Sequence, residues 1–300
     1  MNQLKALKFR LRPFVEADIP AVVKMALRCT YQFSTDDLKS WSKHDPTGIK
    51  VAELDSGEVI GLGACLNHND NISFVGAFIV DEKYRSMKVF PQLMMAAVQH
   101  SGHRNIGGNG YASKVGFLGK VGFKEFEKSW TVKEYEYLGE LRTNLLSDRL
   151  PEGVEIRSLE QNSFESMLLY DRTLVGYDRK FIFKSRSREK NSKTLIALKD
   201  GTCIGYGVVK RNILDAALVG PLYADDVRVA EVMLRKLLES MPNAKGLSMA
   251  TISTNLAINE IVQRMGISVY NNLLRLYTKE HMRINTSKIF AFFDVDFSPF

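Results

Sequence analysis

The chain has 300 residues, about twice the ~150 residues of a typical domain, so two domains or one large domain is expected. Hydrophobic residues make up 45% and charged residues 25% of the chain, which excludes a largely disordered or collagen-like protein. The 41 Lys and Arg exceed the 34 Asp and Glu, and the excess is spread (20 against 17 in residues 1–150, 21 against 17 in the rest), so neither half is a basic arm.

The first half of the chain predicts a short series of strands and helices. In order, these are a strand, a helix, the two strands of a hairpin, a further strand and a helix, at residues 8–13, 15–28, 50–54, 59–67, 71–80 and 91–100. The strand at 71–80 is apolar on both faces, as expected of a strand in the middle of a sheet. Pro91 is well suited to the first turn of the helix that follows.

The second half repeats this order of elements. Its expected strands and helices are at residues 154–159, 170–183, 194–198, 203–210, 216–222, 227–240, 246–253 and 255–265. Pro and Gly interrupt the patterns near residues 148–153. The sequence therefore predicts an α+β protein of two tandem domains, residues 1–147 and 148–300.

The chain offers few cues to a metal, a disulfide or a membrane. Cys29, Cys65 and Cys203 lie far apart without CxxC spacing, so we expect neither a disulfide framework nor a cysteine zinc site. The longest apolar run, residues 72–80, is much shorter than the ~20 residues of a membrane span. The first residues, MNQLKALKFRLRPF, lack the apolar core of a signal peptide. We expect a cytoplasmic protein without a membrane partner.

The segment 80–90 connects the apolar strand to the Pro91 helix and is the first candidate binding site. A strand that runs through a loop into a helix N-terminus presents free N–H groups and the positive end of the helix dipole. The ligand that best suits such a loop is a phosphate group.

Two motifs of the first half resemble the GNAT superfamily of acyl-CoA-dependent N-acyltransferases. Tyr84 and Arg85 match the start of that family's Arg/Gln-x-x-Gly-x-Gly/Ala pyrophosphate loop, and residues 117–123 (FLGKVGF) are similar to its Leu-Tyr-Glu-Lys-x-Gly-Phe. The resemblance extends from Phe9 to about Tyr135. It implies GNAT-like domains, each with a mixed, mostly antiparallel sheet flanked by helices, and acetyl-CoA as the co-substrate.

The resemblance also implies which residues hold acetyl-CoA, although two positions depart from the pattern. The residues concerned are Phe78, Ile79, Val80, Arg85, Ser86, Met87, Lys88, Val89 and Phe90. Lys88 and Phe90 stand where the family has glycines, whose missing side chain allows close backbone approach. The alternative is a loop that caps the helix and binds no CoA.

Candidate catalytic groups are sparse. Leu118 stands where the family often has the tyrosine that protonates the leaving thiolate. Tyr111, seven residues earlier, shares its face if the helix already includes it, and its phenol is a candidate general acid. His68 is a candidate base or a solvated turn residue. Direct attack by an already neutral amine is the third alternative.

The corresponding loop of the second half, residues 220–227, carries Gly-Pro-Leu-Tyr-Ala-Asp and resembles the YitH type of GNAT domain. Asp225 and Asp226 suit a helix N-cap but repel phosphate, so we expect no usable pyrophosphate loop there. The second half then serves as a wall of the acceptor pocket or as a packing partner. The residues to examine, solvated in the alternative case, are Tyr170, Asp171, Tyr177, Asp178 and Arg179.

Two further segments leave alternatives open. Residues 179–193 hold seven basic residues and one acidic residue, the best nucleic-acid cue in the chain, although such loops are usually only solvated. Residues 289–300 (IFAFFDVDFSPF) are unusually aromatic and are expected to fold back onto a domain or onto a second copy in a homo-oligomer.

The sequence predicts an N-acetyltransferase that moves the acetyl group of acetyl-CoA to a primary amine. The first alternative is a non-catalytic GNAT-fold protein that binds CoA or another ligand, which Lys88, Phe90 and Leu118 favour. Nucleic-acid binding is a third hypothesis, and a steep dependence of binding on salt concentration would distinguish it.

Overall fold

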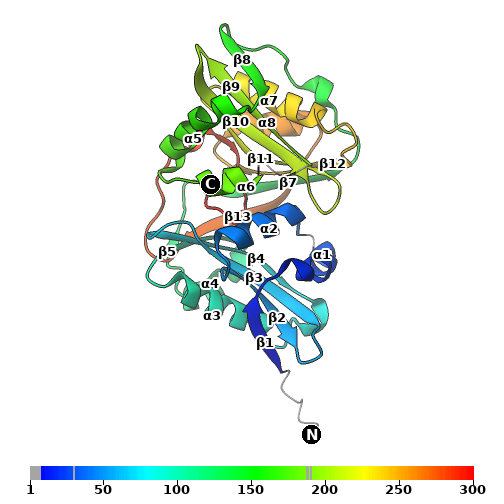
Figure 1. The fold of residues 1–300 in the computed structure, drawn as a ribbon, viewed down its shortest axis with the longest axis vertical. Helices are drawn as coiled ribbons and strands as arrows, with labels where there is room; N and C mark the ends of the chain where they lie inside the picture. Colours follow the sequence, from blue (N-terminus) through cyan, green and yellow to red (C-terminus); the bar gives the residue numbers. More distant parts are fainter. Residues whose placement is uncertain (1–7, 30, 187–188, 190) are drawn as a thin grey trace.

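The computed structural model describes residues 8–29, 31–186, 189 and 191–300, with the first half below and the second half above in Figure 1. The elements of the first half are β1 (Phe9–Pro13), α1 (Ile19–Arg28), α2 (Thr35–His44), β2 (Ile49–Leu54), β3 (Val59–Asn67), β4 (Ile72–Val80), α3 (Val89–Ser101), β5 (Asn105–Gly110), α4 (Val115–Lys120), β6 (Glu125–Phe126) and β7 (Val132–Leu138). Those of the second half are β8 (Val154–Ser158), α5 (Gln161–Val175), α6 (Lys180–Arg186), β9 (Ser192–Lys199), β10 (Thr202–Arg211), β11 (Ala217–Ala224), α7 (Val227–Glu239), β12 (Gly246–Ile252), α8 (Leu256–Arg264), β13 (Val269–Tyr277) and β14 (Ile289–Ala291).

The fold class expected from the sequence is confirmed. Hydrogen-bonded strands follow the order β1-β2-β3-β4-β5-β13-β7-β12-β11-β10-β9-β8, and all neighbours are antiparallel except β4 with β5 and β11 with β12. Helices cover both faces of the sheet: Leu62 and Leu66 of β3 pack in the cluster that contains α1 and α2, whereas Cys65 packs in the cluster that contains α3.

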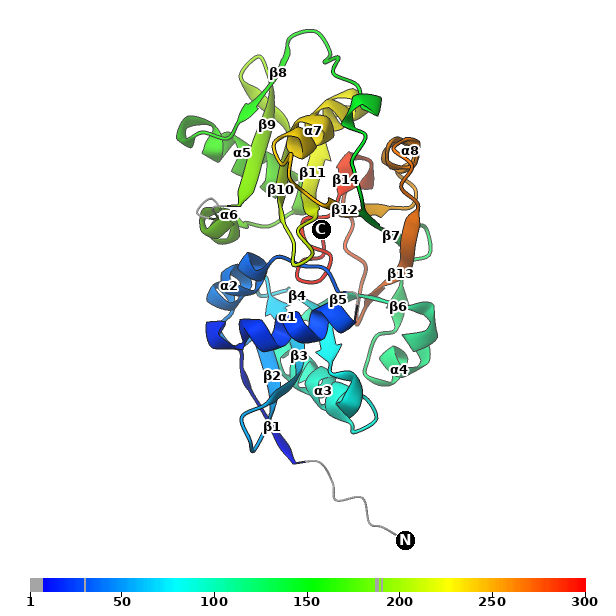
Figure 2. The same ribbon diagram turned by 90° about the vertical axis from the view of Figure 1, so that its right-hand side faces the viewer.

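The two halves exchange a strand at the centre of the sheet. β13 of the second half pairs with β5 of the first half, and β7 of the first half pairs with β12 of the second half. β13 and β7 also pair with each other, so the two sheets join without a break (Figure 2). The boundary near residue 148 stays a prediction, and the sheet crosses it.

Parallel pairing in the first half stops early and leaves what we call the first wedge. Residues 72–75 of β4 pair with residues 105–108 of β5, and the strands then separate. The divergence begins where Ala77 adopts a positive φ of 50° and the register between β3 and β4 shifts. Such a bulge bends a strand and increases its twist. The first wedge is therefore bounded by residues 76–80 and 109–110.

The second half has an equivalent arrangement, the second wedge, but it is closed. Residues 217–219 of β11 pair with residues 247–249 of β12, and the strands then separate. β14 lies between them: Leu222 of β11 is opposite Ala291, and the N–H of Phe292 donates to the oxygen of Ala250 in β12. The second wedge is thus filled by the chain itself.

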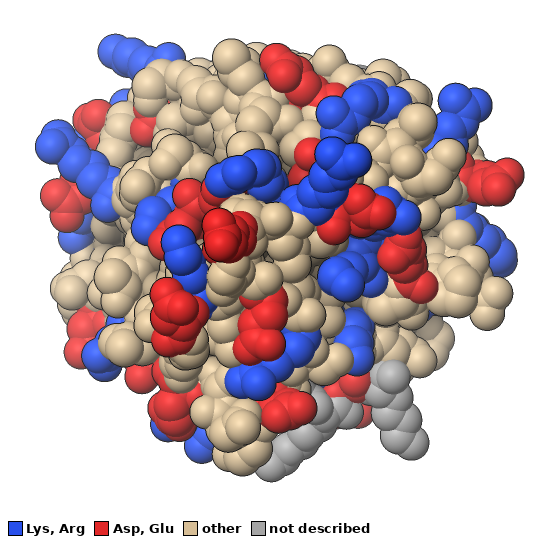
Figure 3. All heavy atoms as spheres, turned by 90° about the horizontal axis from the view of Figure 1, so that it is seen from above, with Lys and Arg blue, Asp and Glu red and all other residues tan. Residues whose placement is uncertain are grey.

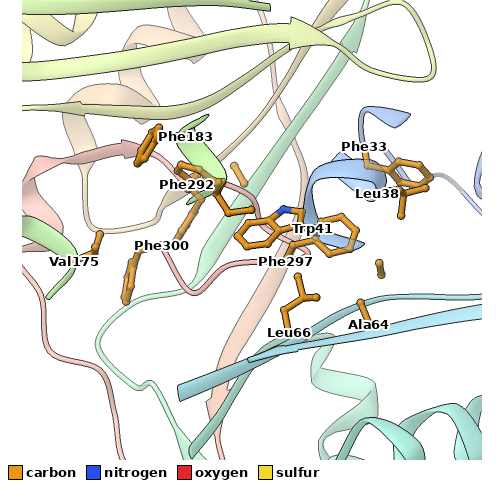
Figure 4. Close-up of a cluster of buried hydrophobic side chains, with 14 of the residues drawn as sticks. Phe33, Leu38, Trp41, Ala64, Leu66, Val175, Phe183, Phe292, Phe297 and Phe300 are labelled. Atoms are coloured by element: carbon orange, nitrogen blue, oxygen red, sulfur yellow. The ribbon is translucent and has the colours of Figure 1, made fainter. Parts of the chain in front are cut away.

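The residues that follow β14 lie buried between the halves. We call residues 289–300 the aromatic segment; Phe290, Phe292, Phe293, Phe297 and Phe300 are each at most 3% exposed. Figure 4 shows Phe292, Phe297 and Phe300 beside Trp41 of α2, Leu66 of β3 and Phe183 of α6. The expectation that this segment folds back onto the protein is confirmed.

The sequence did not predict α2, β5, β7, β13 or β14. β5 reads Asn-Ile-Gly-Gly-Asn-Gly, without the alternation that marks a strand. Its glycines leave room for neighbouring side chains: a Cβ on Gly107 would lie 3.0 Å from the Phe74 ring, and one on Gly108 would lie 2.8 Å from Val75. Close packing in the sheet thus favours glycine at these positions, and the usual strand pattern is absent.

Candidate functional site

A cavity of about 590 Å³ occupies the first wedge and reaches the second half. Its walls come from β4, β5 and β7 on one side and from β11, β12, β13 and residues 292–296 on the other. Residues of both halves therefore line this cavity.

The predicted acyl-CoA strand borders this cavity. Phe78, Ile79 and Val80 line it, beyond the point at which β4 leaves β5. Because β5 has turned away, the backbone of this part of β4 is not paired on that side with β5. An extended ligand with amide groups can pair with such an edge in the manner of an added strand.

The predicted pyrophosphate loop has an unusual backbone at one of the glycine positions. Lys88, the N-cap of α3, has a positive φ of 59° and a ψ of 20°. Glycine adopts this left-handed conformation without steric cost, whereas other residues pay roughly 1–2 kcal/mol for it. The loop thus makes a glycine-type turn with a lysine, which puts an exposed cation at the helix N-terminus.

Phe90, at the second glycine position, turns its ring into the apolar wall. The ring packs against Phe78, with centroids 5.4 Å apart, and against Phe117, at 5.2 Å. Arg85 and Phe90 line the cavity, whereas Ser86, Met87 and Lys88 are exposed on the loop and Val89 is buried beneath it. The structure therefore brings Arg85 and Phe90 to the wedge, whereas Ser86, Met87, Lys88 and Val89 do not line it.

Tyr111 lines the cavity, but it does not lie on the helix that the sequence argument assumed. It precedes α4 and a short 3₁₀ turn and has extended backbone angles, so the argument from a shared helix face with Leu118 was wrong. Its hydroxyl accepts a hydrogen bond from Nδ2 of Asn271 at 3.3 Å. Burial, with a smaller contribution from Glu134, raises the pKa of the phenol, so it stays protonated and able to donate.

Two carboxylates of the cavity were not found by sequence reasoning. Glu134 of β7 accepts a hydrogen bond from Nδ2 of Asn271 at 3.1 Å, and Asp296 of the aromatic segment accepts one from the N–H of Ala77 at 3.4 Å. Burial is the main reason that the pKa of each is raised; Asp294 and Glu134 raise that of Asp296 further. The sequence signal that could have pointed to Asp296 was the pair of acidic residues within the aromatic run IFAFFDVDFSPF.

Asp294, two residues before Asp296, belongs to a buried ionic cluster that also borders the cavity. It accepts hydrogen bonds from Nη2 of Arg186 and Nε1 of Trp41, both at 2.9 Å. Arg186 also pairs with Asp37, which contacts the ammonium of Lys210. Burial opposes ionisation of Asp37, but Lys210 and Arg186 outweigh it and lower its pKa. These charges neutralise one another and join α2 to α6 and β10.

His68 is neither a solvated turn residue nor a residue of the cavity. It is 8% exposed, packs 5.3 Å from the Trp41 ring, and has Nε2 2.9 Å from the main-chain oxygen of Phe297. Burial lowers its pKa to about 3. Its place is structural, and it is not a candidate base for chemistry in the cavity.

The residues singled out in the second half hold the chain together outside this cavity. Asp171 and Arg179 form a buried ion pair, and Arg179 also donates to the main-chain oxygen of Phe300. Tyr177 is buried. Tyr170 donates to Asp225, and Asp178 accepts from the N–H of Lys180. The alternative hypothesis, that these residues are simply solvated, is wrong for Asp171, Tyr177 and Arg179.

The second-half loop is acidic, as expected. Asp226 is the N-cap of α7 and accepts from the N–H of Arg228, which confirms its capping role. Asp225 pairs with Lys288 at 2.8 Å. These contacts secure the loop and leave its carboxylates where a phosphate ligand would be repelled.

The basic run at 179–193 is not a continuous basic surface. Arg179 and Arg186 are each 4% exposed and pair with buried carboxylates; Arg188 and Lys190 lie outside the described residues. On the face shown in Figure 3, Lys and Arg are interspersed with Asp and Glu. In the part of the chain that the structure describes, no helix is long and apolar enough to span a bilayer.

Comparison with known proteins agrees with this architecture. Residues 19–117 match the acetyltransferase (GNAT) family, and residues 167–291 match an acetyltransferase (GNAT) domain. The chain is 21% identical over 271 residues to the holothin acyltransferase of a Pseudoalteromonas strain, covering 90% of this chain and 88% of that protein.

Solved structures share the fold. A Pyrococcus horikoshii protein assigned to the acetyltransferases superposes with a TM-score of 0.74 at 16% identity, over 99% of both chains. A tandem GNAT protein from the clavulanic acid biosynthesis pathway gives a TM-score of 0.65 at 14% identity, over 90% of this chain and 98% of that one. The chain therefore belongs to the GNAT acetyltransferases and carries two GNAT domains in tandem.

Proposed function

We propose that the chain is an N-acetyltransferase that binds acetyl-CoA in the first wedge and transfers the acetyl group to a primary amine. The observation that carries this proposal is the open first wedge: β4 leaves β5 at Gly76, and a cavity follows the free part of β4. The resemblance of this half to acyl-CoA-dependent enzymes supplies the ligand.

Each part of the wedge suits a part of acetyl-CoA. The backbone of Phe78, Ile79 and Val80 offers amide groups to the pantetheine arm, and the rings of Phe78 and Phe90 offer an apolar wall. Arg85 and Lys88, with the first N–H groups of α3, supply positive charge for the pyrophosphate. Ser86, Met87 and Val89 contribute the loop backbone between them.

The chemistry proposed is transfer between two bound reactants. Holding an amine against a thioester removes much of the entropic cost of their encounter. Tyr111 is the proposed acid that protonates the leaving thiolate, because its protonated phenol borders the cavity near Glu134 and Asn271. Leu118 lines the cavity but has no proton to give.

In this proposal residues 148–300 bind no acetyl-CoA. β14 fills the second wedge, and Asp225 and Asp226 occupy its loop. The second half instead supplies the acceptor wall, including Tyr270 and Asn271. The YitH-type relationship of this half is part of the same proposal.

The test is a calorimetric titration of the purified chain with acetyl-CoA. We expect one site, and a loss of at least ten-fold in affinity, about 1.4 kcal/mol, in Arg85→Glu. Arg142→Glu, which changes an exposed arginine that does not line the cavity, is the matched control and should leave the affinity unchanged. Equal affinity in wild type and Arg85→Glu would remove the loop assignment.

A non-catalytic ligand-binding protein is the second candidate. Leu118 at the expected proton donor position favours it. Binding of acetyl-CoA without acetylation of any amine in a broad panel, followed by mass spectrometry, would select this candidate over the enzyme.

A further inference from the structure

The aromatic segment is fixed on both sides of Asp296. Upstream, Nδ2 of Asn109 donates to the main-chain oxygen of Val295 at 2.8 Å, and Arg275 holds Asn109 from its other side at 2.7 Å. Downstream, His68 contacts the main-chain oxygen of Phe297. Asp296 is therefore held in place by first-half residues, although it lies more than 200 positions away from β4 in the sequence.

The position of Asp296 coincides with the opening of the first wedge. Its backbone packs so closely on Gly76 that a Cβ there would lie 2.0 Å from the main-chain oxygen of Asp296. Its carboxylate reaches the N–H of Ala77, the residue of the β4 bulge. The carboxylate thus borders the cavity where the wedge begins.

The groups whose charges act on Asp296 are carboxylates, although basic side chains also line the cavity, among them Lys210, which is paired with Asp37. Asp294, Glu134 and the more distant Asp37 raise its pKa after burial, and it in turn acts on the phenols of Tyr31 and Tyr111. Asp294 and Asp37 have Arg186 as an ion-pair partner. Among residues 8–29, 31–186, 189 and 191–300, no ion pair joins Asp296 or Glu134 to a basic side chain.

Two carboxylates that line one cavity, with no ion-pair partner among the described residues, favour a cation in that cavity. A buried carboxylate without a counterion is costly, and an ammonium group removes that cost for both. Around them the walls carry aromatic rings, among them Tyr31, Tyr270 and Phe292. The complementary ligand is an amine that is protonated in water and has an apolar or aromatic body.

We propose that Glu134 and Asp296 receive the acceptor as an ammonium ion and that Asp296 takes its first proton. This inference rests on the proposed function. The freed lone pair of the nitrogen forms the C–N bond with the thioester carbon, and the C–S bond breaks. The thiolate leaves with the electron pair and takes the second proton, which Tyr111 relays from the nitrogen. The second half thereby supplies a catalytic residue to the first wedge.

Binding of the amine is tested first, without acetyl-CoA. Calorimetry compares 2-phenylethylamine with 2-phenylethanol, which has the same shape and no charge. Wild type should bind the amine at least ten-fold more tightly than the alcohol, and Asp296→Asn and Glu134→Gln should each lose most of that preference. Asp70→Asn, which alters a carboxylate whose side chain is 98% exposed, should keep it. Equal affinities in wild type, or an unchanged preference in Asp296→Asn, would overturn the proposal.

Acetyl-CoA binding by the same variants separates this proposal from the proposed function. Failure of the wild type to bind acetyl-CoA refutes the proposed function, whereas unchanged affinity in Asp296→Asn is expected here. A ten-fold gain in affinity in Asp296→Asn would show that this carboxylate occupies the place of the thioester, and would refute its role as a base.

The dependence of kcat/KM on pH distinguishes a catalytic role of Asp296 from a purely structural one. With acetyl-CoA and 2-phenylethylamine, kcat/KM of the wild type should fall below the pKa of Asp296, and Asp296→Asn should lose this acid limb together with about 10²–10⁴-fold of the rate. Glu134→Gln should mainly raise KM. An acid limb that persists in Asp296→Asn would contradict the assignment.

Discussion

The two wedges of the molecule arise from the same order of elements and end in opposite states. In both, a parallel strand pair separates after a few residues, at β4 and β5 or at β11 and β12. The first holds a cavity, and the second is filled by β14. A Cβ on Gly220 of β11 would lie 2.4 Å from the Phe292 oxygen, much as one on Gly76 would meet Asp296. One segment therefore closes one wedge and borders the other.

The largest expected effect is a loss of stability when a ring that anchors the aromatic segment between the two wedges is removed. Phe297 is fully buried and stacks on Trp41 with centroids 6.3 Å apart. Phe297→Ala should lower the free energy of unfolding by about 3–5 kcal/mol, measured by urea denaturation. Phe181→Ala removes a ring that is 51% exposed and should cost much less. Equal losses would mean that the segment is not part of the core.

A smaller effect is expected at the glycine that lets the segment approach β4. Gly76→Ala places a Cβ against the backbone of Asp296, which cannot move as a side chain does. We expect a loss of about 1–3 kcal/mol in urea denaturation. The control is Gly119→Ala in α4, where a Cβ meets nothing within 4 Å and the change should be neutral or stabilising. A neutral Gly76→Ala would show that the contact is loose.

The contact between His68 and the segment predicts a pH effect. The pKa of His68 falls to about 3 on burial, from an unfolded value near 6.5. The unfolded chain therefore takes up a proton first as the pH falls. Stability from this residue is complete above about pH 6.5 and is lost toward pH 3, by at most about 1.4 kcal/mol per pH unit.

The difference between wild type and His68→Gln isolates this contribution. Unfolding free energies measured between pH 7 and 4 should converge as the pH falls, because the variant lacks the buried imidazole. His103→Gln changes an exposed histidine and should follow the wild type throughout. Parallel curves for wild type and His68→Gln would show that His68 is protonated without cost.

The smallest expected effect concerns the second wedge. Asp225→Lys gives its loop a cation, as Lys88 does in the first half, yet β14 still fills the space between β11 and β12. Calorimetry should still find a single acetyl-CoA site. A second site in Asp225→Lys would mean that loop charge, and not β14, separates the two wedges.

Sequence reasoning predicted those elements that carry a local pattern. Alternation marked β1, two strand-like runs around a turn marked β2 and β3, the apolar run marked β4, and helical spacing marked α7. Glycine hid β5, and no local pattern can say that β13 pairs with β5, because either half offers the same open edge. Arg85 and Phe90 were found because a motif carries their positions, whereas Tyr111 was found from its spacing to Leu118 although no helix joins the two. Glu134 and Asp296 were missed because only the tertiary fold brings them together.

The exchange of β7 and β13 has a consequence for how the protein is made. β5 can receive its neighbour only after the second half has been synthesised, since β13 comes near the end of the chain. Until then a nascent first half exposes an unpaired strand edge, the kind of surface that promotes aggregation and recruits chaperones. Expressing either half by itself would reproduce that vulnerable state permanently, and co-expressing both fragments is the way to relieve it.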